Sequence, residues 1–239
     1  MARQGAPPVK IVCPSGSAEN LYDMTSSIER TQPDFSGKNI IVVADRYDPT
    51  RIAWGWTILE GEEPFCCARN LNLGIKEALE QDPGADVLIV ADDIKFQTQK
   101  PVDALRGHLE DCDVVSPLVK GAAAKIQQFS DGPFEDRLKK FKVKTNHDNP
   151  WFACVAISNY ALRTVGPFRE DLVHFEDTDW CFRGADLPER LGFSFGIATD
   201  VVVNHVTGKS LMRRDVAQWT KDHSASKKKL KQIWGDRVV

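Results

Sequence analysis

The sequence predicts a single α/β domain with a Rossmann-like, mainly parallel central sheet flanked by helices. Short runs rich in Val and Ile alternate with amphipathic segments, as they do where strands covered on both faces are joined by helices. The 239 residues are 42% hydrophobic and 27% charged, which suits one large globular domain and excludes a mostly disordered or fibrous chain. Polar residues follow several apolar runs, and sheets of this kind bind ligands at the carboxyl ends of their strands.

The first half of the chain contains the clearest elements. Each predicted strand is a β-branched run closed by turn residues, and each predicted helix has apolar residues at helical spacing. We expect strands at Val9–Cys13, Asn39–Ala44 and Ala85–Ala91, and helices at Glu19–Arg30 and Phe65–Glu80. The polar residues that follow these strands are Ser15, Asp45, Asp92 and Asp93.

The second half is less regular. Its charged stretch, residues 120–149, predicts an insertion or mobile loop with a helix near Glu135–Phe141. The other expected elements are strands at Val114–Pro117, Trp151–Ser158, Phe193–Ile197 and Val201–His205, a short helix that ends at Gly166, and a basic helix at Asp215–Trp234.

The composition limits the compartment and the partners. No apolar run approaches the roughly 18–20 residues that cross a bilayer, and the first residues lack the apolar stretch of a secretion signal. We therefore expect a cytoplasmic protein without stable membrane insertion. Six cysteines without Cys-x-x-Cys spacing favour buried, reduced thiols. The net charge of −3 gives no global attraction for nucleic acid, although basic residues cluster at Arg213–Arg214 and Lys227–Lys231.

Two adjacent aspartates, Asp92 and Asp93, follow the clearest predicted strand. Because adjacent strand residues point to opposite faces, the two carboxylates are not expected to share one role. One could bind a hard cation while the other accepts hydrogen bonds from a sugar or ribose hydroxyl. The alternative is a turn or a helix cap, since aspartates are common after strands.

Three acids lie within four positions, at Glu176, Asp177 and Asp179. Such like charges raise one another's proton affinity unless a cation compensates them, which is unfavourable for stability and useful for a general base. The alternative is an exposed acidic helix start, with Asp177 or Asp179 as the cap and Arg183 paired at helical spacing.

His205 leaves the last predicted strand and enters a Gly-Lys-Ser loop at Gly208–Ser210. Such a loop suits phosphate oxygens, but the leading glycine of a P-loop and its spacing are missing. A single histidine is more often a structural residue than a ligand. The His205 segment therefore indicates a functional site only together with the two acidic segments.

Taken together and in order, these segments resemble family 2 of the glycosyltransferases, which has the GT-A fold. The resemblance runs from about Val9 to about Gly235, and residues 120–149 are its least matched part. The first aspartate of the family's Asp-x-Asp motif falls on Ala91, so the resemblance supports Asp93 as the metal ligand and leaves the role of Asp92 open. The matched segments are Val9–Pro14, Val42–Asp45, Ala68–Ile75, Val87–Phe96, Ala156–Phe168, Glu176–Arg183, His205–Ser210 and Lys229–Gly235.

The resemblance implies a direct, inverting displacement at the anomeric carbon of a nucleotide-diphospho-sugar, with Asp177 as the catalytic base. Asp93 and His205 would bind Mn²⁺ or Mg²⁺, whose Lewis acidity stabilises the departing diphosphate, and the imidazole favours Mn²⁺. A UDP-sugar is the favoured donor, because the aspartate after the second strand holds the base in the family's uridine-nucleotide enzymes. The implied nucleotide-sugar-binding residues are Pro14, Asp45, Arg69, Asp92, Lys209, Ser210 and Arg213, and the acceptor-binding residues are Trp151 and Glu176.

Residues 1–8 are predicted to be a flexible tail, and the resemblance implies one GT-A domain, 9–235. Within that domain it implies a nucleotide-sugar-binding half, a variable loop or insertion, an acceptor and catalytic half, and a basic C-terminal helix. These four parts cover residues 9–119, 120–149, 150–212 and 213–235, respectively.

Other functions compete with this prediction. A nucleotidyltransferase would show a Gly-rich loop with Lys or Arg after the first strand, whereas Pro14–Asn20 has one glycine and no basic residue. A non-catalytic sugar-nucleotide or glycan binder would not need the acidic trio and His205. The acceptor could be a glycan, a small molecule, or a hydroxymethylated base in DNA, as glycosylated by bacteriophage enzymes. In that last case Lys227–Lys231 would meet phosphates and the base would be flipped out; otherwise the lysines form a solvated helical face.

Overall fold

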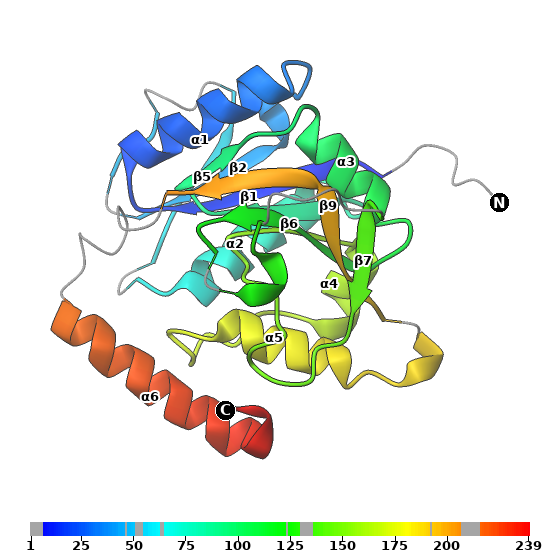
Figure 1. The fold of residues 1–239 in the computed structure, drawn as a ribbon. Coiled ribbons are helices and arrows are strands. Elements are labelled where there is room, and N and C mark those ends of the chain that lie inside the picture. Colours follow the sequence, from blue (N-terminus) through cyan, green and yellow to red (C-terminus); the bar gives the residue numbers. More distant parts are fainter. Residues whose placement is uncertain are drawn as a thin grey trace.

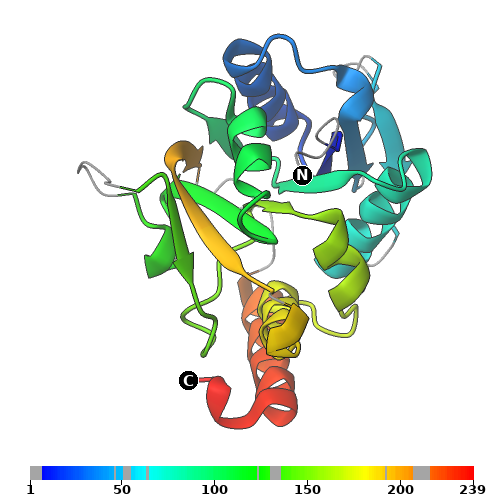
Figure 2. The same cartoon turned by 90° about the vertical axis from the view of Figure 1, so that its right-hand side faces the viewer.

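The computed structural model describes residues 7–45, 47–50, 55–62, 65–122, 124–129, 136–191, 193–206 and 216–239. Over these residues the chain forms one nine-stranded mixed sheet with helices on both faces (Figures 1 and 2). The strands are β1 (Val9–Ser15), β2 (Ile40–Ala44), β3 (Thr57–Glu60), β4 (Asp86–Val90), β5 (Ile94–Phe96), β6 (Val114–Lys120), β7 (Leu138–Phe141), β8 (Cys154–Ile157) and β9 (Phe195–His205). The helices are α1 (Ala18–Thr31), α2 (Cys67–Gln81), α3 (Pro101–His108), α4 (Asn159–Val165), α5 (Glu176–Ala185) and α6 (Val216–Trp234).

The predicted parallel sheet forms in the first half of the chain, and the second half is mixed. The strand order is β3-β2-β1-β4-β8-β6-β9-β5, and β7 also pairs with β9. The pairs β3–β2, β2–β1, β1–β4 and β6–β9 are parallel, whereas β8, β5 and β7 run antiparallel to their neighbours. The carboxyl ends of β1, β2 and β4 therefore meet at one edge of the sheet.

Each face of the sheet has its own apolar core, which explains the unbroken apolar runs of the strands. In β1, Ile11 and Cys13 belong to one core while Val12 belongs to the other. Helices α1 and α3 cover the first face, and α2, α4 and α5 cover the second, as Figure 1 shows above and below the sheet. All six cysteines are free thiols, and five are buried, as the sequence predicted.

Two predicted elements in the second half are wrong. In place of the helix expected near Glu135–Phe141 the structure has strand β7, because Leu138–Phe141 pairs antiparallel with β9 along its whole length. The separate strands Phe193–Ile197 and Val201–His205 are one strand, β9. Its register against β6 shifts between Pro117, which pairs with Ala198, and Leu118, which pairs with Val202, so an irregularity lies within one continuous strand.

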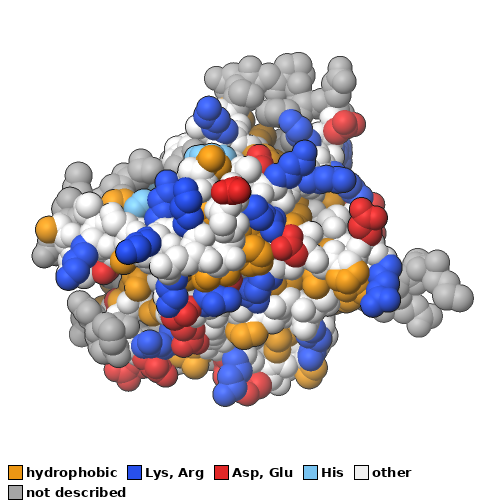
Figure 3. All heavy atoms as spheres, turned by 90° about the horizontal axis from the view of Figure 1, so that it is seen from below, with side chains coloured by type: hydrophobic (Ala, Val, Ile, Leu, Met, Phe, Trp, Pro, Cys, Tyr) orange, Lys and Arg blue, Asp and Glu red, His pale blue; other side chains and the backbone are white. Residues whose placement is uncertain are grey.

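The C-terminal helix α6 packs against the segment that carries α5. Leu230 is fully buried, the indole N–H of Trp234 donates to Asp179 at 2.9 Å, and Lys229 pairs with Asp171 at 2.7 Å. Lys227 and Lys228 are exposed, and Figure 3, seen from below, shows Lys and Arg side chains spread over this face. No helix among the described residues is long and apolar enough to cross a membrane.

Close packing of α2 on the sheet depends on a glycine. A Cβ on Gly74 would lie 2.5 Å from Cγ1 of Val12 and 3.2 Å from Cγ2 of Val43. Gly74→Ala should therefore lower the free energy of unfolding by about 1–3 kcal/mol, measured by urea denaturation. Gly107→Ala in α3 is the matched control, because its Cβ meets nothing within 4 Å; it should raise the free energy of unfolding by about 0.5–1 kcal/mol. Equal effects of the two changes would contradict the packing explanation.

Candidate active site

Asp92 and Asp93 lie in a tight turn that follows β4. The N–H of Ile94 donates to the carbonyl of Ala91 at 3.2 Å, which closes the turn, and both aspartates are buried. Their side chains have different partners, as predicted, but a turn rather than strand alternation separates them. Asp92 lies against the end of β1, and Asp93 lies against the end of β9.

Asp93 and His205 form a close, buried pair. Oδ2 of Asp93 lies 3.2 Å from Nε2 of His205. The pairing of β5 with β9 causes this contact, because Ile94 stands opposite His205 and the N–H of Val206 donates to the carbonyl of Asp93. Nδ1 of His205 is buried and has no hydrogen-bond partner among the described residues, an unusual state for a buried polar atom.

The residues of this pair fit a divalent ion. Two neighbouring ligands of an octahedral ion, each about 2.1 Å from it, stand about 3 Å apart, and the Asp93–His205 separation of 3.2 Å is close to that. Within the described part of the chain no group of three or more His, Cys, Asp and Glu residues could hold a metal. Magnesium and manganese commonly complete their coordination with phosphate oxygens and water, so two protein ligands are compatible with such a site.

Asp177 is the second residue of α5 and is half-buried. Its Oδ1 accepts the N–H of Thr178 at 2.7 Å, and its carboxylate also accepts the backbone N–H of Phe152. Burial raises the pKa of Asp177, while these hydrogen bonds oppose the rise. The result is a carboxylate that attracts protons more strongly than an ordinary aspartate, as a general base requires.

The segment Trp151–Phe152 joins Asp177 to the Asp93–His205 pair. The ring of Trp151 meets the ring of His205 edge-on, with centroids 4.5 Å apart, and the next residue donates to Asp177. The N–H of Ala91, just before the two aspartates, donates to the carbonyl of Ala153 at 2.7 Å. Trp151, the predicted acceptor-binding residue, is half-buried and contacts His205, the predicted metal ligand.

Asp179, in contrast, is a structural residue. It is fully buried and lies 3.0 Å from Nε of Arg183 and 3.5 Å from Nε of Arg169. It also accepts the indole N–H of Trp234. Arg183 therefore pairs at helical spacing with Asp179, as the structural alternative for the acidic segment predicted. Glu176, the predicted acceptor-binding acid, is half-buried at the first position of α5, next to Asp177.

Two of the predicted donor-binding residues lie at the carboxyl edge of β1 and β2. Pro14 is half-buried in β1, opposite Val43, and the N–H of Asp45 donates to the carbonyl of Ser15 at 2.8 Å. Arg69 lies in the first turn of α2, with Nε 3.5 Å from Glu62 and 3.6 Å from Glu170. The predicted phosphate-binding residues Lys209, Ser210 and Arg213 lie outside the described residues.

The motifs did not identify two groups that contact these residues. The hydroxyl of Tyr47 lies 2.6 Å from Oγ of Ser15, which in turn donates to Asp92. The second group is the backbone N–H of Phe152, which reaches Asp177. Tyr47 could have been noticed in the sequence, because it stands two residues beyond Asp45. The contact of the Phe152 N–H could not, because every residue except proline has a backbone N–H.

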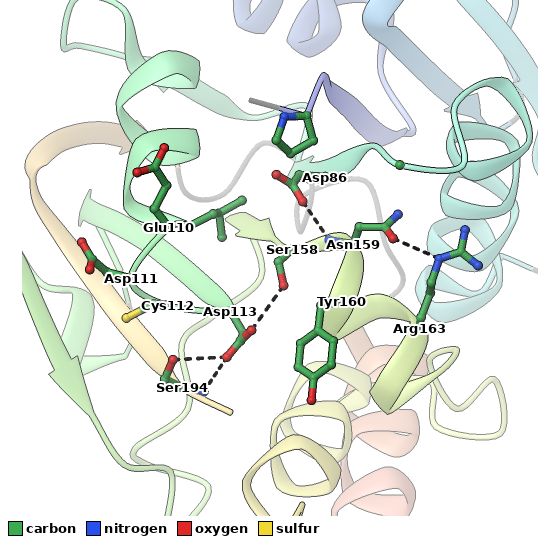
Figure 4. A pocket seen from close by; sticks show the side chains of 13 residues that line it. Asp86, Glu110, Asp111, Cys112, Asp113, Ser158, Asn159, Tyr160, Arg163 and Ser194 are labelled. Carbon is green, nitrogen blue, oxygen red and sulfur yellow. Dashed lines mark hydrogen bonds between the residues drawn. The ribbon is translucent and has the colours of Figure 1, made fainter. Parts of the chain in front are cut away.

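A hollow of about 820 Å³ lies at the opposite edge of the sheet. Figure 4 shows Asp86, Asp113, Asn159 and Arg163 around it, and the hydrogen bonds that tie Asp86 to Asn159 and Asn159 to Arg163. Asp86 is the first residue of β4, whereas Asp92 and Asp93 follow its last residue. The hollow is therefore separate from the site of the two aspartates.

The strand order, the helices on both faces and the acids at the carboxyl edge define a mixed α/β fold of the GT-A type. Crystal structures of TarS from S. aureus share it: the first has a TM-score of 0.58 and 16% identity and covers 82% of this chain and 36% of that chain. Two structures of TarS residues 1–349, one of them in complex with UDP, have TM-scores of 0.55 and 0.56. Both have 15% identity and cover 82% of this chain and 60% of that chain. No family model and no curated protein matches the sequence.

Proposed function

We propose that this chain is a metal-dependent, inverting hexosyltransferase of glycosyltransferase family 2, which moves a sugar from a UDP-sugar to an acceptor hydroxyl. The observation that carries the proposal is the convergence of Asp177 with the Asp93–His205 pair through Trp151–Phe152. A half-buried base beside a buried carboxylate–imidazole pair matches the needs of this reaction. The fold supports the donor, because one of the TarS structures that share it contains UDP.

In the proposed reaction Asp177 removes the proton of the acceptor hydroxyl. The acceptor oxygen forms its bond to the anomeric carbon while the bond from that carbon to the diphosphate breaks. The electron pair of the broken bond stays on the diphosphate oxygen, and UDP leaves. Because the acceptor attacks the face opposite the leaving group in a single step, the configuration at the anomeric carbon inverts.

Asp93 and His205 are the proposed ligands of Mn²⁺ or Mg²⁺, with the imidazole favouring Mn²⁺. The bound ion would supply Lewis-acid stabilisation of the charge on the leaving diphosphate. Asp45 is the proposed contact to the uracil base. Arg69 is the proposed contact to the base or the diphosphate, and its ion pairs with Glu62 and Glu170 would restrict the movement of its guanidinium.

The acceptor we propose is the hydroxyl of a glycan or a small molecule, bound near Trp151 and Glu176. A hydroxymethylated base in DNA is the alternative, and the exposed Lys227, Lys228 and Lys231 of α6 favour it.

A donor screen tests the proposed function. The protein is incubated with UDP-glucose, UDP-galactose, UDP-N-acetylglucosamine and GDP-mannose, each with Mn²⁺ or with EDTA, and released nucleotide is measured. We expect UDP release from at least one UDP-sugar in the Mn²⁺ samples, and none with EDTA. Adding duplex DNA that contains hydroxymethylcytosine examines the alternative acceptor, which is wrong if no sugar enters the DNA.

The other outcomes distinguish the competing functions. Release of pyrophosphate from UTP and a sugar phosphate would indicate a nucleotidyltransferase. Tight binding of UDP-sugars without any turnover would indicate a non-catalytic binder. Neither binding nor turnover with all four donors would contradict the proposed function itself.

A further inference from the structure

A chain of hydrogen bonds runs between three elements that are distant in the sequence. The hydroxyl of Tyr47, after β2, lies 2.6 Å from Oγ of Ser15 at the end of β1. Oγ of Ser15 donates to Oδ2 of Asp92, after β4, at 2.8 Å. The same carboxylate oxygen accepts the N–H of Gly16 at 3.0 Å. Ser15 and Asp92 are buried, while Tyr47 is half-buried.

The donors and acceptors determine the direction of this chain. The hydroxyl of Ser15 has a single proton, and it donates that proton to Oδ2 of Asp92. The oxygen of Ser15 must then accept the proton of Tyr47. Burial raises the pKa of Tyr47, so its phenol stays protonated and remains a donor. Asp92 therefore orients Ser15, and Ser15 fixes the phenol of Tyr47.

The chain of hydrogen bonds crosses the point where the order of the strands reverses. β1 continues through α1 to β2 on one side, while β4 lies on its other side. In open α/β sheets, ligands bind in the crevice at such a point, beyond the carboxyl ends of the strands. The bond from Ser15 to Asp92 spans this crevice, and Tyr47 lies two residues beyond Asp45, the proposed contact to the base.

Asp92 is also separate from the metal pair. Its Oδ2 is occupied by Ser15 and Gly16, and the side chain of Asn20 hydrogen-bonds to the same carboxylate. Asp93, the next residue, meets His205 instead. The two neighbouring carboxylates thus belong to two different parts of the site.

We propose that Tyr47 contacts the nucleoside of the donor, and that Ser15 and Asp92 are positioning residues that hold it in place. This inference rests on the proposed function, since it assigns a role within the same nucleotide site. Tyr47 is half-buried and packs against the apolar core of the first face, and the hydrogen-bond chain removes the freedom of its ring before the ligand arrives. The part of the ring that stays accessible would contact the base or the ribose. Pre-ordered side chains bind more tightly because less entropy is lost on binding.

Titration calorimetry with UMP and with UDP, each with and without Mn²⁺, tests the inference. Tyr47→Ala should weaken the binding of both nucleotides by the same factor, about tenfold or more, because the nucleoside that UMP and UDP share loses its contact with the ring. Tyr47→Phe and Ser15→Ala should each weaken both by about three- to tenfold, and the double variant should be no weaker than the worse single one. The gain in UDP affinity from Mn²⁺ should not change in any of them. If Tyr47 and Ser15 only stabilised the fold, these variants would also reduce the gain in UDP affinity from Mn²⁺.

Tyr160→Phe and Tyr160→Ala are the matched controls. The hydroxyl of Tyr160 reaches the carbonyl of Leu191 at 3.4 Å, at the other edge of the sheet, so nucleotide affinity should stay at the wild-type value. If Tyr47→Ala does not fold, as judged by circular dichroism, Tyr47→Phe and Ser15→Ala decide the matter, because both remove only a hydroxyl.

Two results would overturn the inference. The first is wild-type affinity for UMP and UDP in Tyr47→Phe and Ser15→Ala. The second is a loss confined to UDP with Mn²⁺, which would place Tyr47 with the diphosphate rather than the nucleoside. Failure of the wild-type protein to bind UDP is a different result, since it contradicts the proposed function without any variant.

Discussion

Asp177→Asn is expected to reduce the rate of sugar transfer by about 10²–10⁴-fold, because it removes the proposed general base. UDP affinity should hardly change, since the asparagine oxygen can still accept the N–H of Thr178 and the side chain keeps its size. The measurement is the single-turnover rate with saturating donor and acceptor, beside the UDP dissociation constant. A fall in rate with unchanged affinity identifies an interaction made only in the transition state.

Asp186→Asn is the control for this change. Asp186 directly follows the same helix, α5, and its carboxylate pairs with Arg237 at 2.6 Å on the surface. The Asp186→Asn variant loses the same charge as Asp177→Asn and should keep the wild-type rate of sugar transfer. A wild-type rate in Asp177→Asn would remove the base assignment, and an equal loss in both variants would trace the effect to the helix.

The pH dependence gives an independent measurement of the same residue. A base acts only when it is ionised, so activity falls as the pH drops through its pKa. Burial raises the pKa of Asp177, so the acid limb of the kcat/KM profile should lie above the ordinary aspartate value of about 3.9. An acid limb at or below that value would contradict the assignment.

The second large effect is expected at the Asp93–His205 pair. Asp93→Asn and His205→Ala should each reduce transfer by at least about 10²-fold, because several kcal/mol of charge stabilisation at the leaving group are lost. Both should also weaken Mn²⁺ binding in the presence of UDP, measured by the electron paramagnetic resonance signal of free Mn²⁺. That second readout does not depend on turnover.

The chain contains a matched control for this pair. His108 in α3 lies 2.8 Å from Asp200 in β9, as another His–Asp pair attached to the same strand. His108→Ala and Asp200→Asn should leave Mn²⁺ affinity and transfer unchanged. Unaltered Mn²⁺ affinity in a folded His205→Ala protein would mean that the imidazole is not a metal ligand. His205→Gln, which keeps a polar group in the buried space, replaces it if His205→Ala does not fold.

The strands and helices of the first half could be predicted because their local patterns are unambiguous. β1, β2 and β4 are buried on both faces, so they are continuous β-branched runs. The strands β3 and β5 were not predicted, because four and three residues carry too little pattern, and the eight-residue helix α3 was not predicted either. The residues of β7 were predicted as a helix. They form a strand because Leu138–Phe141 pairs with β9, and this pairing cannot be read from the charged run itself.

By itself, the sequence determined which residues stand where the strands end, because turn chemistry and hydrophobic runs are local. Only the tertiary structure distinguished Asp93, beside His205, from Asp92, beside Ser15, and Asp177 from the salt-bridged Asp179. The reason is that a carboxylate takes its role from its neighbours. Strand pairing brings His205 to Asp93 across 112 positions and Ser15 to Asp92 across 77, and the packing of α6 on α5 brings Trp234 to Asp179 across 55. No local motif contains these contacts.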